Sequence, residues 1–168
     1  MFVIARALTY AALFIGLIFI FLPGQLLFWS GIARPTVTGP PQIAGMIIGG
    51  VGAAIALWCV FSFAAIGKGT PAPFDPPRRL VIEGPYRFVR NPMYVGASLG
   101  LAGTAIFYGS LSLSIYAAAF LLAAHLFVVF YEEPTLRKSF GAEYEAYCQR
   151  IRRWVPGRTL LFHLKINR

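Results

Sequence analysis

Residues 111–136 read LSLSIYAAAFLLAAHLFVVFYEEPTL, and this stretch decides the class of fold. The segment 111–131 contains no Asp, Glu, Lys or Arg and is predominantly apolar, as expected for an α-helix that crosses a lipid bilayer. Two glutamates and a proline follow it directly. The stretch therefore predicts a transmembrane helix over residues 111–131 that ends at a polar membrane surface.

Three more apolar segments, at residues 2–22, 43–66 and 93–108, predict further membrane helices. The chain has 168 residues, of which 58% are hydrophobic and 12% charged, and its mean hydropathy is +0.68. An average soluble domain is about half apolar and about a quarter charged. We therefore predict an all-α integral membrane bundle of about four transmembrane helices, organised as a single membrane domain over residues 1–168. Segment 2–22 is expected to be retained, because it is longer than a signal-peptide core and no small-residue cleavage site follows it.

The distribution of charge predicts the orientation, because short loops rich in Lys and Arg stay in the cytoplasm. With four crossings, Arg34 is the one basic residue of 15 that falls on the far side, and all six acidic residues fall on the near side. Both termini are therefore expected in the cytoplasm, and the absence of organelle signals favours a bacterial inner membrane. The net charge of +9 suits a face beside anionic lipid headgroups, so we expect membrane lipid and no nucleic acid as a partner.

Small residues recur at a spacing of four within two of the apolar segments. They are Gly45 and Gly49 in one, and Gly96 and Gly100 in the other. This spacing allows two helices to approach closely in a membrane. The Gly-Val-Gly at residues 50–52 is not read as a dinucleotide-binding motif, because the third glycine is missing and no strand precedes it.

The two cysteines predict neither a disulfide nor a metal site. Cys59 lies in an apolar run and Cys148 in the polar tail, so they are expected at different depths, and neither belongs to a metal-like cluster. We expect a buried packing residue at Cys59 and an incidental thiol at Cys148.

The loop over residues 67–92 is rich in proline and arginine. Its prolines fix backbone φ angles and remove amide donors, which makes the loop stiff. Pro92 suits the first residue of the next helix and Asn91 its N-cap. The free amides at that helix start, together with Arg90, predict an anion-binding position.

Glu132 and Glu133 lie side by side at a membrane boundary, where two carboxylates require compensation. One interpretation is a new helix that begins near Pro134, since acidic residues stabilise a helix start. A second is an ion-pair network with Arg87 and Arg90. A third is a ligand site. All three remain open from the residues alone.

The tail over residues 132–156 is expected to carry an amphipathic helix through residue 153, since apolar side chains recur there at spacings of three and four.

His125 is a further feature of interest, because an ionisable group within a membrane span is a functional candidate. A neutral histidine bonded to a neighbouring helix is the alternative. We take His125 as a candidate on the substrate side.

Two segments together resemble a known family. Residues 84–94 read GPYRFVRNPMY, and residues 132–147 contain EEPTL followed by FGxxYxxY. In this order they are similar to the isoprenylcysteine carboxyl methyltransferases and the related bacterial phospholipid methyltransferases, over roughly residues 67–156. The resemblance implies S-adenosylmethionine as cofactor, in a pocket between the cytoplasmic helix ends and the loop and tail that cover it. It assigns to the cofactor site Leu80, Val81, Tyr86, Arg90, Asn91, Tyr94, Glu132 and Glu133, with Glu132 on the cofactor's ammonium group.

The chain departs from that family at two places. Many members have histidine where Asn91 stands, and asparagine cannot act as a base. The segment 121–131 lacks the arginine that is thought to hold a prenylcysteine carboxylate. We therefore expect methyl transfer to another lipophilic small molecule or lipid-like acceptor that reaches the site from the bilayer. An NADPH-dependent membrane reductase of the sterol-reductase type and a non-catalytic membrane protein are the alternatives.

Overall fold

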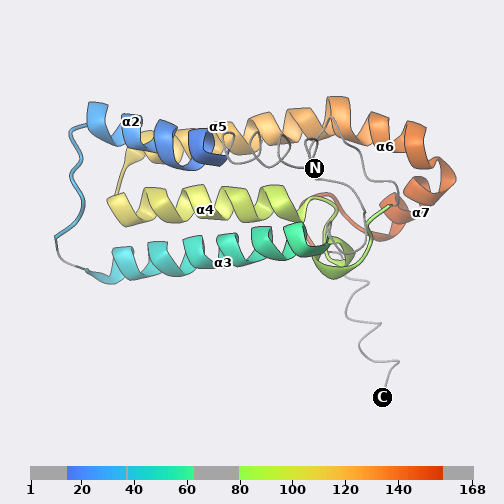
Figure 1. Cartoon of the computed structure of the whole chain (residues 1–168), viewed down its shortest axis with the longest axis horizontal. Coiled ribbons are helices and arrows are strands. Elements are labelled where there is room, and N and C mark those ends of the chain that lie inside the picture. Colours follow the sequence, from blue (N-terminus) through green and yellow to red (C-terminus); the bar gives the residue numbers. More distant parts are fainter. Residues whose placement is uncertain (1–14, 37, 63–79, 157–168) are drawn as a thin grey trace, which may run out of the picture. The chain divides into compact units, whose positions relative to one another are not determined.

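The computed structural model describes residues 15–36, 38–62 and 80–156, and within these ranges the chain forms helices and no strand (Figure 1). The predicted all-α class is confirmed for this part of the chain. The fold divides into two units: Met1–Ala53 with Ala97–Leu122, and Ala54–Gly96 with Ala123–Arg168. They are called unit 1 and unit 2, and each is described by itself.

Among the residues that the structure describes, two helices are long and apolar enough to cross a membrane. The first is α3 (Pro40–Ser62), and the second is the continuous helix Leu111–Phe140. Large apolar side chains on both are exposed, including Ile47 and Leu122, as expected for helices that face lipid. By contrast α4 (Pro92–Tyr108) has 17 residues and does not reach that length. The length and composition of these two helices agree with association with a membrane, and the four-span bundle stays a prediction.

Unit 1 contains the shorter helical segments η1 (Leu17–Phe21) and α2 (Leu22–Trp29), which lie within and beyond the predicted segment 2–22. The Tyr116 hydroxyl donates a hydrogen bond to the Ile18 carbonyl at 3.0 Å, which ties η1 to the helix that begins at Leu111. Residues 1–14, which hold most of the predicted first span, lie outside the described residues.

Helices α3 and α4 touch backbone to backbone in unit 1. A Cβ atom added to Gly45 would lie 2.6 Å from the Gly103 carbonyl oxygen, and one added to Gly103 would lie 2.5 Å from the Gly49 nitrogen. The predicted Gly45 and Gly49 therefore do lie at a close helix contact. Their main partner is Gly103, whereas the predicted Gly100 lies at the margin, 3.9 Å from a Cβ on Gly49.

The helix that begins at Leu111 continues past the predicted end at residue 131. It comprises α5 (Leu111–Phe127), the π-helical turn η4 (Val128–Glu132) and α6 (Glu133–Phe140), which Figure 1 shows as one run. Pro134 has no amide to donate, and a wide turn directly before it accommodates such a residue. The Glu133 amide accordingly donates to the Val128 carbonyl, five residues back. The predicted helix start near Pro134 is therefore present, with Pro134 and the acidic Glu133 in the first turn of α6, but α6 is continuous with α5 through the π-helical turn.

The expected amphipathic tail helix is broken. After α6 the chain turns at Gly141, whose φ of 50° is left-handed, and α7 (Ala142–Arg150) follows. Ile151 then has extended backbone angles, and residues 151–156, which we call the strap, contain no helix. The prediction of one helix through residue 153 was wrong because apolar spacing alone does not register a glycine that reverses φ.

Unit 2 has a core beneath its loop. Cys59 from α3 packs with Val81 and Tyr86, and Tyr86 lies in the 3-10 turn η3 (Gly84–Arg87). Gly84 has φ of 59°, and a Cβ there would lie 2.5 Å from the Ser62 hydroxyl oxygen, so the turn presses against the end of α3. The prediction that Cys59 is a buried packing residue is confirmed.

Candidate functional site

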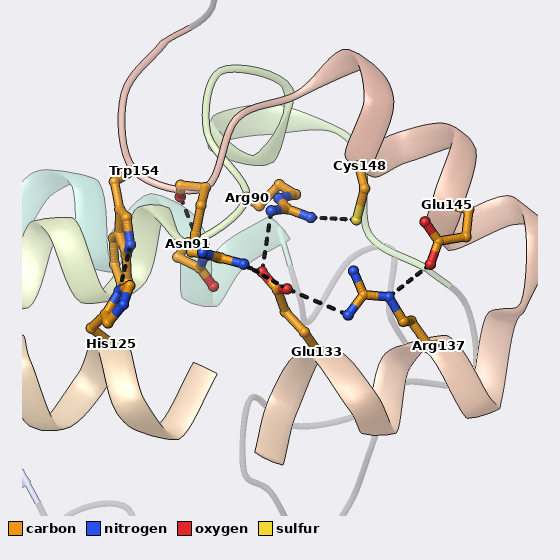
Figure 2. Close-up of polar contacts among 9 residues, drawn as sticks. Arg90, Asn91, His125, Glu133, Arg137, Glu145, Cys148 and Trp154 are labelled. Atoms are coloured by element: carbon orange, nitrogen blue, oxygen red, sulfur yellow. Dashed lines mark hydrogen bonds and ion pairs between the residues drawn. The ribbon is translucent and has the colours of Figure 1, made fainter. Parts of the chain in front are cut away.

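Glu133 is the centre of an arginine cluster in unit 2 (Figure 2). Its side chain is 3% exposed. Arg153 binds it as a fork, with Nε 2.7 Å from Oε1 and Nη2 2.9 Å from Oε2. Arg90 Nη2 lies 3.2 Å from Oε1, and Arg137 Nη1 lies 3.7 Å from Oε2. One buried carboxylate therefore joins the loop, α6 and the strap, because a bidentate pair is among the strongest and most directional polar contacts.

The cluster matches the ion-pair interpretation only in part. Arg90 pairs with Glu133 as that interpretation expects, whereas the Arg87 guanidinium lies over the Phe88 ring, 4.8 Å from its centroid. Arg137 has a second partner, with its Nε 2.7 Å from Glu145 Oε1. The hydrogen bond to Glu133 raises the pKa of Arg153 above its ordinary value.

Glu132, one residue earlier, has a different environment. The Tyr94 hydroxyl donates a hydrogen bond to Glu132 Oε2 at 3.0 Å. Within residues 15–36, 38–62 and 80–156, no Lys or Arg forms an ion pair with Glu132. Its carboxylate is half-buried and therefore partly shielded from water. Such a carboxylate suits a positively charged ligand, because a nearby cation compensates its desolvation.

Arg90 and Asn91 lead into α4. The Asn91 carbonyl accepts the Val95 amide at 3.2 Å, which makes Asn91 the entry to the first helical turn, as an N-cap does. Its side-chain Nδ2 donates to the Arg153 carbonyl at 3.3 Å, and the Arg90 amide donates to the Arg152 carbonyl at 2.9 Å. The strap is thus fastened to the start of α4 by main-chain and side-chain bonds.

The Arg90 guanidinium is 10% exposed and has several neighbours. Besides Glu133, its Nη1 contacts the Cys148 sulfur (Figure 2). Cys148 therefore borders the buried cluster, a position that the expectation of an incidental thiol did not include. Arg90 Nε is buried and has no hydrogen-bond partner among the described residues. An orphaned buried donor costs free energy, so a bound carboxylate or an ordered water is the partner it requires.

The remaining predicted cofactor residues lie in or beside the core. Val81 is 4% exposed and packs with Tyr86, while Leu80 is half-buried in the chain just before it. The Tyr86 carbonyl accepts a hydrogen bond from the Tyr147 hydroxyl at 2.6 Å, which joins the loop to α7. Burial raises the pKa of both phenols above the ordinary value, so both stay neutral.

His125 on α5 is bonded to the strap. The Trp154 indole Nε1 donates a hydrogen bond to His125 Nδ1 at 3.1 Å, and the ring centroids are 5.9 Å apart (Figure 2). The alternative interpretation expected His125 to bond to a neighbouring helix. His125 does form a hydrogen bond to a distant residue, but that residue, Trp154, lies in the strap and not in a helix.

Sequence reasoning missed Arg153, Trp154 and Tyr147 as site-forming residues. All three make contacts to residues at least 20 positions away. The signal that was available is the run Arg-Arg-Trp-Val-Pro at residues 152–156, where a proline prevents further helix and leaves neighbouring side chains to bind elsewhere. Among the described residues, no group of three or more His, Cys, Asp or Glu could hold a metal ion.

Exposed apolar helices and a buried cluster of opposite charges at their ends define a helical, membrane-associated protein with a polar site. Residues 40–143 match the family model described as phospholipid methyltransferase, and the chain belongs to this family of methyltransferases. The resemblance drawn from the two sequence segments is thereby confirmed.

Two curated relatives support the same assignment. A probable protein-S-isoprenylcysteine O-methyltransferase of Oryza sativa subsp. indica is 33% identical over 86 residues, which is 49% of this chain and 44% of the relative. Protein-S-isoprenylcysteine O-methyltransferase B of Arabidopsis thaliana is 36% identical over 81 residues, which is 46% of this chain and 40% of the relative. The chain therefore matches these relatives over less than half of their length.

Proposed function

We propose that this chain transfers a methyl group from S-adenosylmethionine to a lipophilic small-molecule or lipid-like acceptor at a membrane. The observation that carries the proposal is the unequal environment of two adjacent carboxylates. Glu133 is bound by three arginines, whereas Glu132 meets Tyr94 and pairs with no Lys or Arg of the described ranges. One carboxylate is thus structural and the other is available to a cationic ligand.

The donor set fits the proposed cofactor. Its amino-acid part carries an ammonium group, which suits Glu132, and a carboxylate, which suits Arg90 Nε and the amides at the start of α4. Tyr94 would orient Glu132 through the hydrogen bond that the two already share. When bound, the cofactor supplies an activated methyl group. The chain's own task is then to hold acceptor and donor in line, which accounts for much of the acceleration of such a reaction.

The membrane arrangement belongs to the same proposal. We propose about four spans with both termini in the cytoplasm of a bacterium, and a cofactor site covered by the loop 67–92 and the tail 132–156. The two long apolar helices and their exposed side chains support this arrangement. An acceptor dissolved in the bilayer would then approach from the lipid side, and the curated relatives are named for an acceptor that carries an isoprenyl group, protein-S-isoprenylcysteine.

The direct test is calorimetric titration of detergent-solubilised protein with S-adenosylmethionine, S-adenosylhomocysteine and NADPH. We expect the first two to bind, Glu132→Gln to abolish that binding, and Glu143→Gln to leave it unchanged, since Glu143 is exposed. Binding of NADPH alone would instead identify a reductase. Binding of none of the three by folded protein would identify a non-catalytic relative.

A further inference from the structure

The strap joins two parts of the site through adjacent residues. The Arg153 guanidinium binds the Glu133 carboxylate, and the Arg153 carbonyl accepts a hydrogen bond from the Asn91 side chain. The Trp154 indole donates a hydrogen bond to His125. Figure 2 shows the Trp154 indole and the His125 ring directed toward each other. Two consecutive residues of the strap thus contact both the residues proposed for the cofactor and the histidine in α5.

The chemistry of the Trp154 bond determines which nitrogen of His125 carries a proton. Indole N–H can only donate, so Nδ1 of His125 must accept with a lone pair. A neutral imidazole that accepts at Nδ1 carries its proton at Nε2, and an imidazolium could not accept at all. The Nε2–H bond points away from the indole, because the two ring nitrogens face divergent directions.

The Nε2 group itself has no acceptor among residues 15–36, 38–62 and 80–156. Its helix neighbours Leu122 and Leu126 are exposed apolar residues. Nε2 is not one of the buried polar atoms that lack a partner, so it is accessible at the helix surface, where an oxygen or nitrogen of a ligand can accept its hydrogen bond.

We propose that Trp154 is a positioning residue that fixes His125 as a neutral hydrogen-bond donor, with Nε2–H directed to the methyl acceptor. This inference rests on the proposed function. His125 keeps its proton throughout, so it orients an acceptor that already presents a lone pair. It does not serve as the base that some acceptors would require.

The first test reads the tautomer and needs no activity. The chain has two histidines, so a His163→Gln background leaves His125 as the one source of signal in ¹⁵N NMR of histidine-labelled protein. At neutral pH we expect the Nε2–H tautomer, and in Trp154→Phe a mixture of both tautomers. Trp29→Phe, at a residue 75% exposed, is the matched control and should leave the spectrum unchanged. An Nδ1–H tautomer, an imidazolium, or no change in Trp154→Phe would overturn the proposal.

The second test compares two replacements of His125. The amide nitrogen of His125→Gln can stand near the Nε2 position, whereas His125→Leu removes the donor. With oleate in detergent micelles as the probe, a lipophilic carboxylate that presents lone pairs without a base, we expect KM for the acceptor to rise about three- to tenfold in His125→Leu and to stay near wild type in His125→Gln. Equal KM values in both variants would overturn the acceptor-facing role.

The two proposals fail separately. Binding of S-adenosylhomocysteine should be retained by Trp154→Phe, since Trp154 is not among the residues proposed for the cofactor. Wild-type protein that binds no cofactor but shows the Nε2–H tautomer would overturn the proposed function and the acceptor-facing role that depends on it. Protein that binds the cofactor but shows a mixed tautomer would overturn the role of Trp154 alone.

Discussion

Replacing Glu133 with glutamine should destabilise the fold far more than the same change at Glu132. Glu133 is 3% exposed and joins Arg90, Arg137 and Arg153, so the variant leaves the largely buried Arg90 guanidinium without a counter-charge, whereas Arg153 is partly exposed and Arg137 keeps Glu145. Removing one partner of a buried ion pair costs about 3–5 kcal/mol. Because Arg153 is 32% exposed and can rehydrate, we take the lower end, about 3 kcal/mol. For a chain of this size that corresponds to a fall in Tm of about 6–12 °C.

Glu132→Gln should lower Tm by much less, because an amide oxygen can still accept from Tyr94 and no ion pair is broken. The assay is thermal unfolding of both variants in one detergent, followed by near-ultraviolet circular dichroism. Binding of S-adenosylhomocysteine should show the opposite order, with the loss confined to Glu132→Gln where both variants are measured folded. Equal destabilisation by the two changes would refute the assignment of one structural and one ligand-facing carboxylate.

Two further predictions concern contacts within each unit. Gly103→Leu should prevent α3 and α4 from packing and lower Tm by more than 10 °C or abolish folded protein, because even a Cβ would overlap the backbone of Gly49. Gly50→Leu is the control and should be tolerated, since a Cβ at Gly50 meets open space. Size-exclusion chromatography and thermal unfolding of both variants test this prediction. Tyr147→Phe should cost about 1 kcal/mol of unfolding free energy by leaving the buried Tyr86 carbonyl without its phenol donor, and Tyr131→Phe, at an exposed residue, should cost little in the same unfolding assay.

Local features of the sequence predicted the parts of the fold that depend on local physics. Pro92 begins α4, and glycines spaced by four lie where α3 meets its neighbour. Gly103 escaped notice because it lies three residues after Gly100, and the choice between spacings of three and four depends on how two helices cross. The turn at Gly141 was not predicted either, because a positive φ is a property of the folded backbone.

The strap was beyond prediction for a different reason. An extended segment has no helical periodicity, so nothing in residues 151–156 indicates which distant groups they contact. The bonds from Arg153 to Glu133 and from Trp154 to His125 form when the chain returns over the helix ends. Long-range pairs of this kind need coordinates.

The adjacent glutamates could not be separated from sequence, because both carry the same group at the same membrane boundary. The turn η4 and the arginines that gather on Glu133 distinguish them in the structure. The result is a carboxylate beside an arginine-rich cluster, which is the charge pattern that complements an α-amino acid with its ammonium and carboxylate on one carbon. A phosphate of a nicotinamide cofactor would instead require guanidinium groups free of carboxylates. In the cluster around Glu133, Arg90, Arg137 and Arg153 are all paired with glutamate, and Arg90 Nε is left to bind one carboxylate, which favours the methyl donor over NADPH at this cluster.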